Sequence, residues 1–144
     1  MKISTRGRYG LRMMIDIAEH VDDGPISLEA IAERQGISFK YAESLMRSLV
    51  KANLVKSSRG KTGGYCLSKK TNKYSLEEIL TATEGDLYPI DCLSCTTLVC
   101  PKQDKCKARK MWADYYRIIK DYFSSISLSS LVGNSSFYED GLGI

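Results

Sequence analysis

The sequence predicts a mainly α-helical protein with a small β-wing, organised as a winged helix-turn-helix domain followed by a long dimerisation helix. Two short helical patterns lie on either side of a turn at residues 35–37, an arrangement typical of a helix-turn-helix. A basic, glycine-rich stretch at residues 58–64 separates two short strand patterns, as in a β-wing. Residues 107–125 carry aliphatic and aromatic residues at helical spacing, which predicts one long amphipathic helix.

The chain length and composition fit this architecture. A chain of 144 residues, 43% apolar and 26% charged, is long enough to bury one compact core with an appendage. We expect the winged helix-turn-helix domain at residues 1–70, a connecting helix at 71–90 and a cysteine-rich, cluster-binding loop at 91–107. The dimerisation helix and a following short helix would occupy 108–132, and 133–144 would form a mobile tail.

The net charge of +4 is concentrated in the first half of the chain. Residues 1–70 contain 13 lysines and arginines against 7 aspartates and glutamates, whereas residues 71–144 contain 8 against 10. A basic half attracts phosphates, but it indicates DNA only where an element that reads bases lies within it. The N-terminus has no apolar run after its basic residues, so no signal peptide is expected. The protein is therefore predicted to be soluble and cytoplasmic, with no membrane partner.

The first helix is predicted over residues 7–21, with Ser4 or Thr5 as its N-cap and apolar residues at helical spacing. Ser27 is the expected N-cap of a short second helix, whose apolar residues form its buried side. These buried positions are Leu28, Ile31 and Ala32. Gly36 follows in the turn, where glycine readily takes a positive φ.

The third helix is predicted to begin after its N-cap, Ser38, and to end at about residue 53. Its inward-facing residues are Tyr41, Ala42, Leu45, Leu49 and Val50. A continuous polar stripe lies on another face and consists of Lys40, Glu43, Ser44, Arg47 and Lys51. Such a stripe ordinarily means only a solvated surface. Its place between a helix-turn-helix and a second basic element favours double-stranded DNA as the partner.

The second basic element is a wing formed by strands at residues 55–57 and 65–67. Arg59 and Lys61 in the intervening loop can enter a minor groove or contact phosphates. The GxxxxGK[ST] pattern is missing and no helix follows directly, so a nucleotide-phosphate loop is disfavoured. Cys66 is expected to face the core by strand alternation. The candidate DNA-binding residues are Ser38, Lys40, Tyr41, Glu43, Ser44, Arg47, Arg59, Lys61 and Gly63.

After the wing, a capping box formed by Ser75 and Glu78 predicts a helix over residues 75–84, which Gly85 ends. The long helix over 107–125 has a much wider apolar surface. This surface consists of Met111, Trp112, Tyr115, Tyr116, Ile118, Ile119, Tyr122, Phe123 and Ile126. Because it is too wide for one small domain to cover, we expect it to pair with the same helix of a second subunit in a homodimer.

Four of the five cysteines, Cys92, Cys95, Cys100 and Cys106, fall within 15 residues. In a reducing cytoplasm, clustered cysteines are more often metal ligands or redox-active thiols than disulfides. The spacing is C-x2-C-x4-C-x5-C, whereas zinc ribbons separate their two CxxC pairs by a longer interval. Soft thiolates suit iron–sulfur clusters, so a [2Fe–2S] cluster is the favoured cofactor. Zinc, or a thiol sensor with no metal, is the alternative.

Taken together, these motifs resemble the IscR/NsrR/CymR (Rrf) family of bacterial winged-helix regulators. The resemblance covers KISTRGRYG at residues 2–10, the helix-turn-helix IAERQGIS at 31–38 and the wing RGxxGGY at 59–65. It extends through Trp112 to residues 127–132. The resemblance implies a homodimer linked by crossed long helices, with a winged helix-turn-helix on each subunit. In members of the iron–sulfur (IscR) type, three cysteines hold a [2Fe–2S] cluster that controls which DNA sites are bound.

Several positions of this chain match functional positions of the family. Glu43 and Ser44 fall where the recognition helix reads bases, and Arg59 corresponds to the wing residue that contacts a groove. Three cysteines fall at the cluster-ligand positions, namely Cys92, Cys100 and Cys106. The resemblance thus implies both a DNA-reading surface and a cluster site.

The cysteine loop departs from the family pattern. Seven residues, instead of five, separate Cys92 from Cys100, and Cys95 lies between them. Arg109 and Arg8 stand where some members supply a ligating histidine or aspartate. Cys95 is therefore the hypothesised fourth ligand, which would give all-thiolate ligation and a lower potential than histidine ligation.

The favoured function is a dimeric, sequence-specific transcriptional regulator whose [2Fe–2S] cluster senses iron–sulfur, redox or nitric oxide status. The alternative within DNA binding is a metal-free repressor of sulfur or cysteine metabolism that responds to thiols or to a partner enzyme. An iron–sulfur electron carrier is disfavoured, because it has no use for a reading helix and a wing. Enzymatic activity is not expected, since no nucleophile–base pair is recognisable and His20 is the only histidine.

Overall fold

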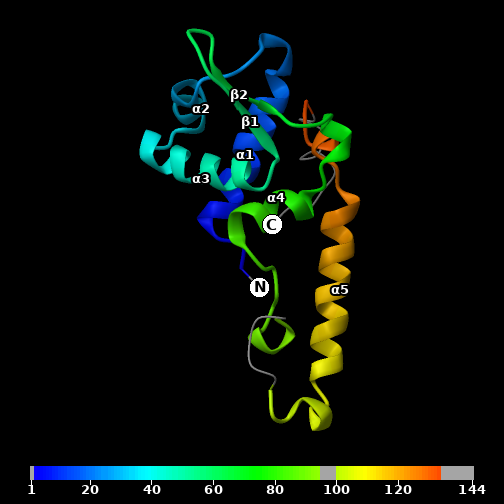
Figure 1. The fold of residues 1–144 in the computed structure, drawn as a ribbon. Helices are drawn as coiled ribbons and strands as arrows, with labels where there is room; N and C mark the ends of the chain where they lie inside the picture. The colour runs from blue at the N-terminus through cyan, green and yellow to red at the C-terminus, as the bar shows by residue number, and fades with distance from the viewer. Residues whose placement is uncertain (1, 95–99, 134–144) are drawn as a thin grey trace.

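The computed structural model describes residues 2–94 and 100–133. Figure 1 shows a head of short helices and a hairpin, from which one long helix extends. The elements are α1 (Thr5–Glu19), α2 (Leu28–Gln35), α3 (Phe39–Lys51), β1 (Val55–Ser58), β2 (Gly64–Leu67), α4 (Leu76–Glu84) and α5 (Arg109–Ser125). Short 3-10 turns occupy Val21–Asp23, Thr71–Lys73, Asp91–Leu93, Gln103–Lys105 and Leu128–Ser130. The predicted fold class, mainly α with a two-stranded wing, is confirmed.

Serine N-caps define the starts of the four helices in the head. A backbone N–H in the first turn of α1, α2, α3 and α4 donates to the side chain of Ser4, Ser27, Ser38 and Ser75 respectively. Ser75 and Glu78 form the complete predicted capping box. The caps of α2, α3 and α4 are the ones that the sequence predicts, and each cap satisfies an N–H that has no partner within its helix.

The boundaries of three helices differ from the predicted ones, and of these α3 ends at Lys51 rather than at about residue 53. α1 begins at Thr5, because Ser4 rather than Thr5 is its cap. It ends at Glu19, so Val21 lies in a 3-10 turn with 53% of its surface exposed instead of on the apolar face. The backbone forms this tighter 3-10 turn before the chain reaches α2. α5 begins at Arg109 rather than at residue 107.

The head has one hydrophobic core, to which α1, α2 and α3 each contribute a buried face. The most deeply buried side chains from these helices are Met13, Met14, Ile17, Ile31, Leu45, Met46 and Leu49. The predicted buried side of α2 is confirmed. On α3, Tyr41 and Val50 are only half-buried at the edge of the core, whereas Met46, which the sequence pattern did not assign, is fully buried.

The wing is an antiparallel hairpin in which Val55 pairs with Leu67 and Lys56 pairs with Cys66. Because Val55 is buried, its partner Leu67 faces the core, and Tyr65 packs against the core as well. Side chains alternate along a strand, so Cys66 points to the opposite face, beside the exposed Lys56. The prediction that Cys66 faces the core is therefore wrong.

Tyr74 ties the base of the wing to the helices. Its side chain is 1% exposed, and its hydroxyl donates to the carbonyl of Leu54 at 2.8 Å. The hydroxyl also accepts from the backbone N–H groups of Ser68 and Lys69 at 2.8 and 2.9 Å. Burial raises the pKa of Tyr74 above its ordinary value, although the two accepted hydrogen bonds oppose this, so the hydroxyl keeps its proton at neutral pH.

We expect Tyr74→Phe to lower the free energy of unfolding by about 1–3 kcal/mol, because the Lys69 N–H would lose its partner, and the Ser68 N–H and the Leu54 carbonyl would keep only the 3.2 Å hydrogen bond between them. Urea denaturation followed by circular dichroism measures this change. Tyr9→Phe is the matched control, since Tyr9 is only half-buried and its hydroxyl makes no hydrogen bond with any described residue. Its free energy of unfolding should change by less than about 0.5 kcal/mol. An unchanged urea midpoint for Tyr74→Phe would contradict the anchoring role.

α5 leaves the head and contacts it along only one side. The contacting residues are Tyr116, Phe123 and Ile126, which pack against a smaller core of Leu76, Leu80 and Leu87. The other side remains uncovered, since Met111, Ile118 and Tyr122 are 52%, 62% and 56% exposed. The broad apolar face that the sequence predicts is thus divided in two. Neither α5 nor any other helix in the described residues is long and apolar enough to cross a membrane.

Candidate nucleic-acid interface and cysteine loop

The polar stripe of α3 is a solvent-facing surface. Lys40, Ser44 and Arg47 are exposed, and so is Lys51 at the end of the helix. Glu43 is half-buried, and its Oε1 lies 2.9 Å from Nη2 of Arg47 in an i,i+4 ion pair. Such a surface pair contributes less than about 1 kcal/mol, so both side chains can exchange it for another partner. The stripe presents cations, a carboxylate and a hydroxyl, the groups that contact phosphates and base edges in protein–DNA complexes.

Two further candidates, Ser38 and Tyr41, lie at the N-terminal end of α3. The Ser38 hydroxyl accepts from the Tyr41 N–H at 3.2 Å, as an N-cap. The Tyr41 ring packs edge-on against Tyr9, with 6.0 Å between ring centroids, and the Arg12 guanidinium lies 4.8 Å above the Tyr9 ring. Ser38 and Tyr41 therefore have structural partners in the free protein, and α1 supplies a cation next to them.

The wing carries its cations at the tip of the hairpin. Arg59 and Lys61 are both exposed there. Gly63 is required by the loop, because a Cβ would lie 2.5 Å from the carbonyl oxygen of Ser58 and 2.9 Å from that of Gly60. A groove of about 290 Å³ separates the hairpin from α3, and it is lined by Met46, Arg47, Val50, Lys51, Ser57 and Tyr65. The stripe and the wing thus border one continuous surface.

A buried carboxylate that the sequence analysis did not single out joins α1 to α2. Asp16 is 3% exposed, and it accepts from the Arg34 guanidinium through Nε, at 2.9 Å, and through Nη2. Gln35 Nε2 donates to the same carboxylate at 2.9 Å. The hydrogen bond to Asp16 raises the pKa of Arg34 above its ordinary value, so the guanidinium stays charged. In the sequence, the feature that could have revealed this buried carboxylate is the position of Asp16 among apolar residues at helical spacing.

A second junction, also not predicted, joins the start of α1 to the end of α4. The Glu84 carboxylate accepts from the backbone N–H groups of Ser4 and Gly7, and from the Ser4 hydroxyl at 2.6 Å. Gly7 and Gly10 allow this approach, because a Cβ on either would collide with the side chain of Glu84 or Thr83. In the sequence, the feature that could have revealed this close contact is the pair of glycines three positions apart on one helix. The junction fixes α1 against the helix that leads to the cysteine loop.

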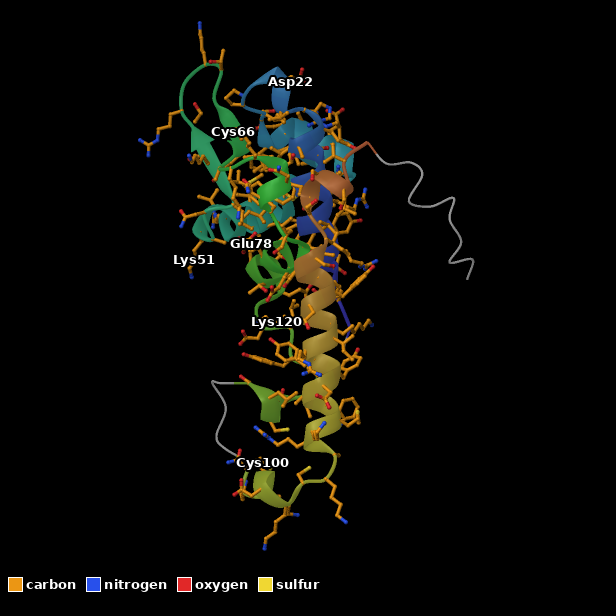
Figure 2. The ribbon with its side chains drawn as sticks, turned by 90° about the vertical axis from the view of Figure 1, so that its right-hand side faces the viewer. Asp22, Lys51, Cys66, Glu78, Cys100 and Lys120 are labelled. Atoms are coloured by element: carbon orange, nitrogen blue, oxygen red, sulfur yellow. The ribbon has the colours of Figure 1, made fainter. Side chains whose placement is uncertain are left out.

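The cysteine loop lies at the opposite end of the molecule from the wing. Figure 2 shows the labelled Cys100 near the start of α5 and the labelled Cys66 in the wing. Two other predicted ligands, Cys92 and Cys106, lie in or directly after short 3-10 turns of this loop. Cys95 lies outside the described residues. Any effect of the loop on the head must therefore be transmitted through α4 or α5.

Three ligands are not brought together in the described part of the loop. Within residues 2–94 and 100–133, no three His, Cys, Asp or Glu side chains are grouped closely enough to hold a metal ion. At the start of α5, the Arg109 N–H donates to the carbonyl of Cys106 at 3.3 Å. The Arg109 Nε is buried and has no hydrogen-bond partner among the described residues. An unpartnered buried donor on the first residue of the helix that follows the cysteines suits an anionic, thiolate-bound group.

Comparison with known proteins finds similarity along almost the whole chain. The Rrf2 family model, described as an iron-dependent transcriptional regulator, matches residues 3–134. The HTH-type transcriptional regulator IscR of Yersinia enterocolitica is 36% identical over 139 residues. The aligned region covers 96% of this chain and 84% of that protein.

Two solved structures share the fold. CymR, described as the global cysteine regulator of B. subtilis, matches with a TM-score of 0.74 and 35% identity. The match covers 91% of this chain and 95% of CymR. IscR of T. potens matches with a TM-score of 0.72 and 32% identity, over 99% of this chain and 94% of that one. The arrangement of helices and wing is therefore shared by a regulator named CymR and a regulator named IscR.

Proposed function

The chain belongs to the Rrf2 family of transcriptional regulators, and we propose that it is a homodimeric, sequence-specific DNA-binding regulator controlled by a [2Fe–2S] cluster in its cysteine loop. Its matched relatives are transcriptional regulators rather than enzymes. The observation that supports DNA reading most strongly is the continuous surface formed by the α3 stripe and the wing. In the proposed complex, α3 lies in the major groove and Arg59 and Lys61 contact the flanking backbone or minor groove.

The exposed side of α5 supports the proposed homodimer. Met111, Ile118 and Tyr122 present an apolar row that nothing in the described chain covers. A shallow groove of about 490 Å³ runs along the same side and is lined by Lys107, Lys110, Met111, Asp114, Tyr115 and Ile118. Two copies of this helix would cover each other's row. The resulting two-fold symmetry would place two reading heads on a palindromic site.

Selection from a pool of randomised duplex DNA tests the reading function. We expect the protein to enrich a palindrome whose half-sites lie about one helical turn, or a multiple of it, apart. A variant that lacks both wing cations, Arg59→Ala with Lys61→Ala, should bind the enriched site more weakly and with a smaller dependence on salt. Failure of the unaltered protein to enrich any sequence would contradict the proposal.

The proposed cluster is held by Cys92, Cys100, Cys106 and the hypothesised fourth ligand, Cys95. Thiolates are the usual ligands of such clusters, and the bound cluster supplies a redox-active, iron-dependent signal. The buried Nε of Arg109 would stabilise the negative charge that the thiolates bring to the loop. If these cysteines held a cluster, the two ends of the loop would be drawn together. These ends continue into α4 and α5, so closure would act on the junction with α1 and on the dimer helix.

We expect Cys95→Ala to yield protein that loses its cluster on desalting, or that shows an altered visible spectrum, because one of two irons would lack a ligand. The measurement is the visible spectrum and the iron and sulfide content of protein purified without oxygen. Cys66→Ala is the matched control and should leave both unchanged, since Cys66 lies in the wing. An unchanged spectrum and unchanged cluster stability in Cys95→Ala would rule Cys95 out as the fourth ligand.

A second candidate function is a metal-free regulator of sulfur or cysteine metabolism that responds to thiols or to a partner enzyme. Two observations favour it. The fold matches B. subtilis CymR as well as it matches T. potens IscR. In addition, no three of the described cysteine, histidine and carboxylate side chains are grouped as metal ligands. Under this proposal the cysteines act as thiols, and DNA binding is independent of iron.

A further inference from the structure

Arg6 joins three helices at the edge of the proposed reading surface. From α1, its Nε donates to the carbonyl of Thr83 at 3.2 Å, at the end of α4, where helical carbonyls lack partners within the helix. On α3, its Nη1 donates to Ser44 Oγ at 3.3 Å and its Nη2 donates to Ser48 Oγ at 3.2 Å. The planar guanidinium is thus held from one side by α4 and directed at two hydroxyls on the other side.

The two serine hydroxyls that accept from Arg6 differ in what they can still donate. Ser48 Oγ lies 3.5 Å from the carbonyl of Ser44, one helical turn earlier, and donates its proton there. For the Ser44 hydroxyl, no described residue accepts the proton, and the side chain is exposed on the polar stripe. A hydroxyl has one proton to donate and two acceptor positions, of which Arg6 occupies one. Accepting from a charged guanidinium polarises the hydroxyl, which makes it a stronger donor and a weaker acceptor. The Ser44 proton therefore remains available for a partner outside the protein.

We propose that Arg6 is a positioning residue that sets base specificity by fixing Ser44 as a hydrogen-bond donor. This inference rests on the proposed function, because it requires α3 to lie in the major groove. There guanine, adenine and thymine each present an acceptor, whereas cytosine presents only its N4 amino donor. In this state Ser44 donates to any of these three bases at the position it faces. It disfavours cytosine, because the amino group would meet a weakened acceptor beside the Arg6 cation.

Without Arg6, the same serine loses this preference. Its hydroxyl is then no longer polarised by the guanidinium and has both acceptor positions free, so it accepts from the cytosine N4 amino group more readily. Arg6→Met keeps most of the length of the side chain but removes all its donors. Arg6→Lys keeps the charge and one flexible donor group, so it cannot hold Thr83, Ser44 and Ser48 together as a planar fork does.

The test measures binding of the full-length protein to the duplex enriched by selection, with every base pair replaced in turn. The position read by Ser44 is the one at which Ser44→Ala loses its preference. There the unaltered protein should bind the cytosine duplex roughly tenfold more weakly than the best duplex. Arg6→Met should lose most of this discrimination, and adding Ser44→Ala should cause no further loss. Arg8→Met, the control, removes a charge two residues along α1 and should keep the preference.

Three results would overturn the inference. If the Arg6→Met protein retained full discrimination against cytosine, Ser44 would need no positioning by Arg6. Uniformly weaker binding to all duplexes, with the salt slope reduced by about one, would make Arg6 a phosphate contact. Uniform weakening with a lowered melting temperature would make its role structural only. Absence of any enriched sequence for the unaltered protein would instead remove the proposed function itself.

Discussion

Replacing Ile118 by aspartate is expected to convert the dimer to monomers and to weaken DNA binding by about a hundredfold or more. Ile118 is 62% exposed on the uncovered side of α5, in a row with Met111 and Tyr122. In the proposed dimer this row is buried against its copy, and two aspartates facing each other there would be desolvated and would repel. A monomer holds only one half-site, so it loses the gain from binding both at once.

Sedimentation velocity and titration of the enriched palindrome measure the two effects of Ile118→Asp. Val21→Asp is the matched control, because Val21 is also an exposed aliphatic residue, at 53%, but lies in the head. It should sediment and bind DNA as the unaltered protein does. An Ile118→Asp protein that still sediments as a dimer would show that another surface joins the subunits.

Asp16→Asn is expected to lower the free energy of unfolding by about 2–3 kcal/mol, because it leaves the Arg34 guanidinium without its carboxylate. Removing one partner of a fully buried ion pair costs more than this, but 35% of the Arg34 side chain is in contact with water. The pair and Gln35 hold α2 against α1, and α2 in turn supports α3. Loss of the pair should therefore also loosen the reading helix.

Urea denaturation measures the effect of Asp16→Asn, and Glu43→Gln is its control. Glu43 belongs to an ion pair on the surface of α3, so its loss should change the free energy of unfolding by less than about 1 kcal/mol. Equal stability changes in the two variants would mean that the buried pair contributes no more than a solvated one. That result would remove Asp16 from the residues that position the head.

Features of the head that depend on neighbours in sequence could be predicted from the sequence. The caps Ser27, Ser38 and Ser75 satisfy N–H groups within the next turn, so their effect is local. The α3 stripe follows from helical periodicity alone. In contrast, the contact of Arg6 with Ser44 spans 38 residues, and that of Ser4 with Glu84 spans 80. Nothing in the local pattern indicates such pairs.

The orientation of Cys66 and the division of the α5 surface both depend on contacts between residues that are distant in the sequence. The orientation of Cys66 depends on which residues of the opposite strand are buried, and hence on the register between Val55 and Leu67. The division of the α5 surface depends on where α4 packs, because Tyr116 and Phe123 lie against the small core to which α4 contributes Leu76 and Leu80. The cysteine spacing indicates which chemistry the loop suits, but the grouping of ligands depends on how the loop closes in three dimensions.

The central proposal, a DNA reader controlled by an iron–sulfur cluster, is tested most directly by one measurement on protein purified without oxygen. Its visible spectrum and its iron and sulfide content are recorded, and binding to the enriched palindrome is then compared before and after the cluster is removed. We predict a coloured protein with iron and sulfide in equal amounts, whose DNA affinity changes when the cluster is removed. A colourless protein that binds the same DNA tightly, with or without added iron, would contradict cluster control and favour the metal-free regulator.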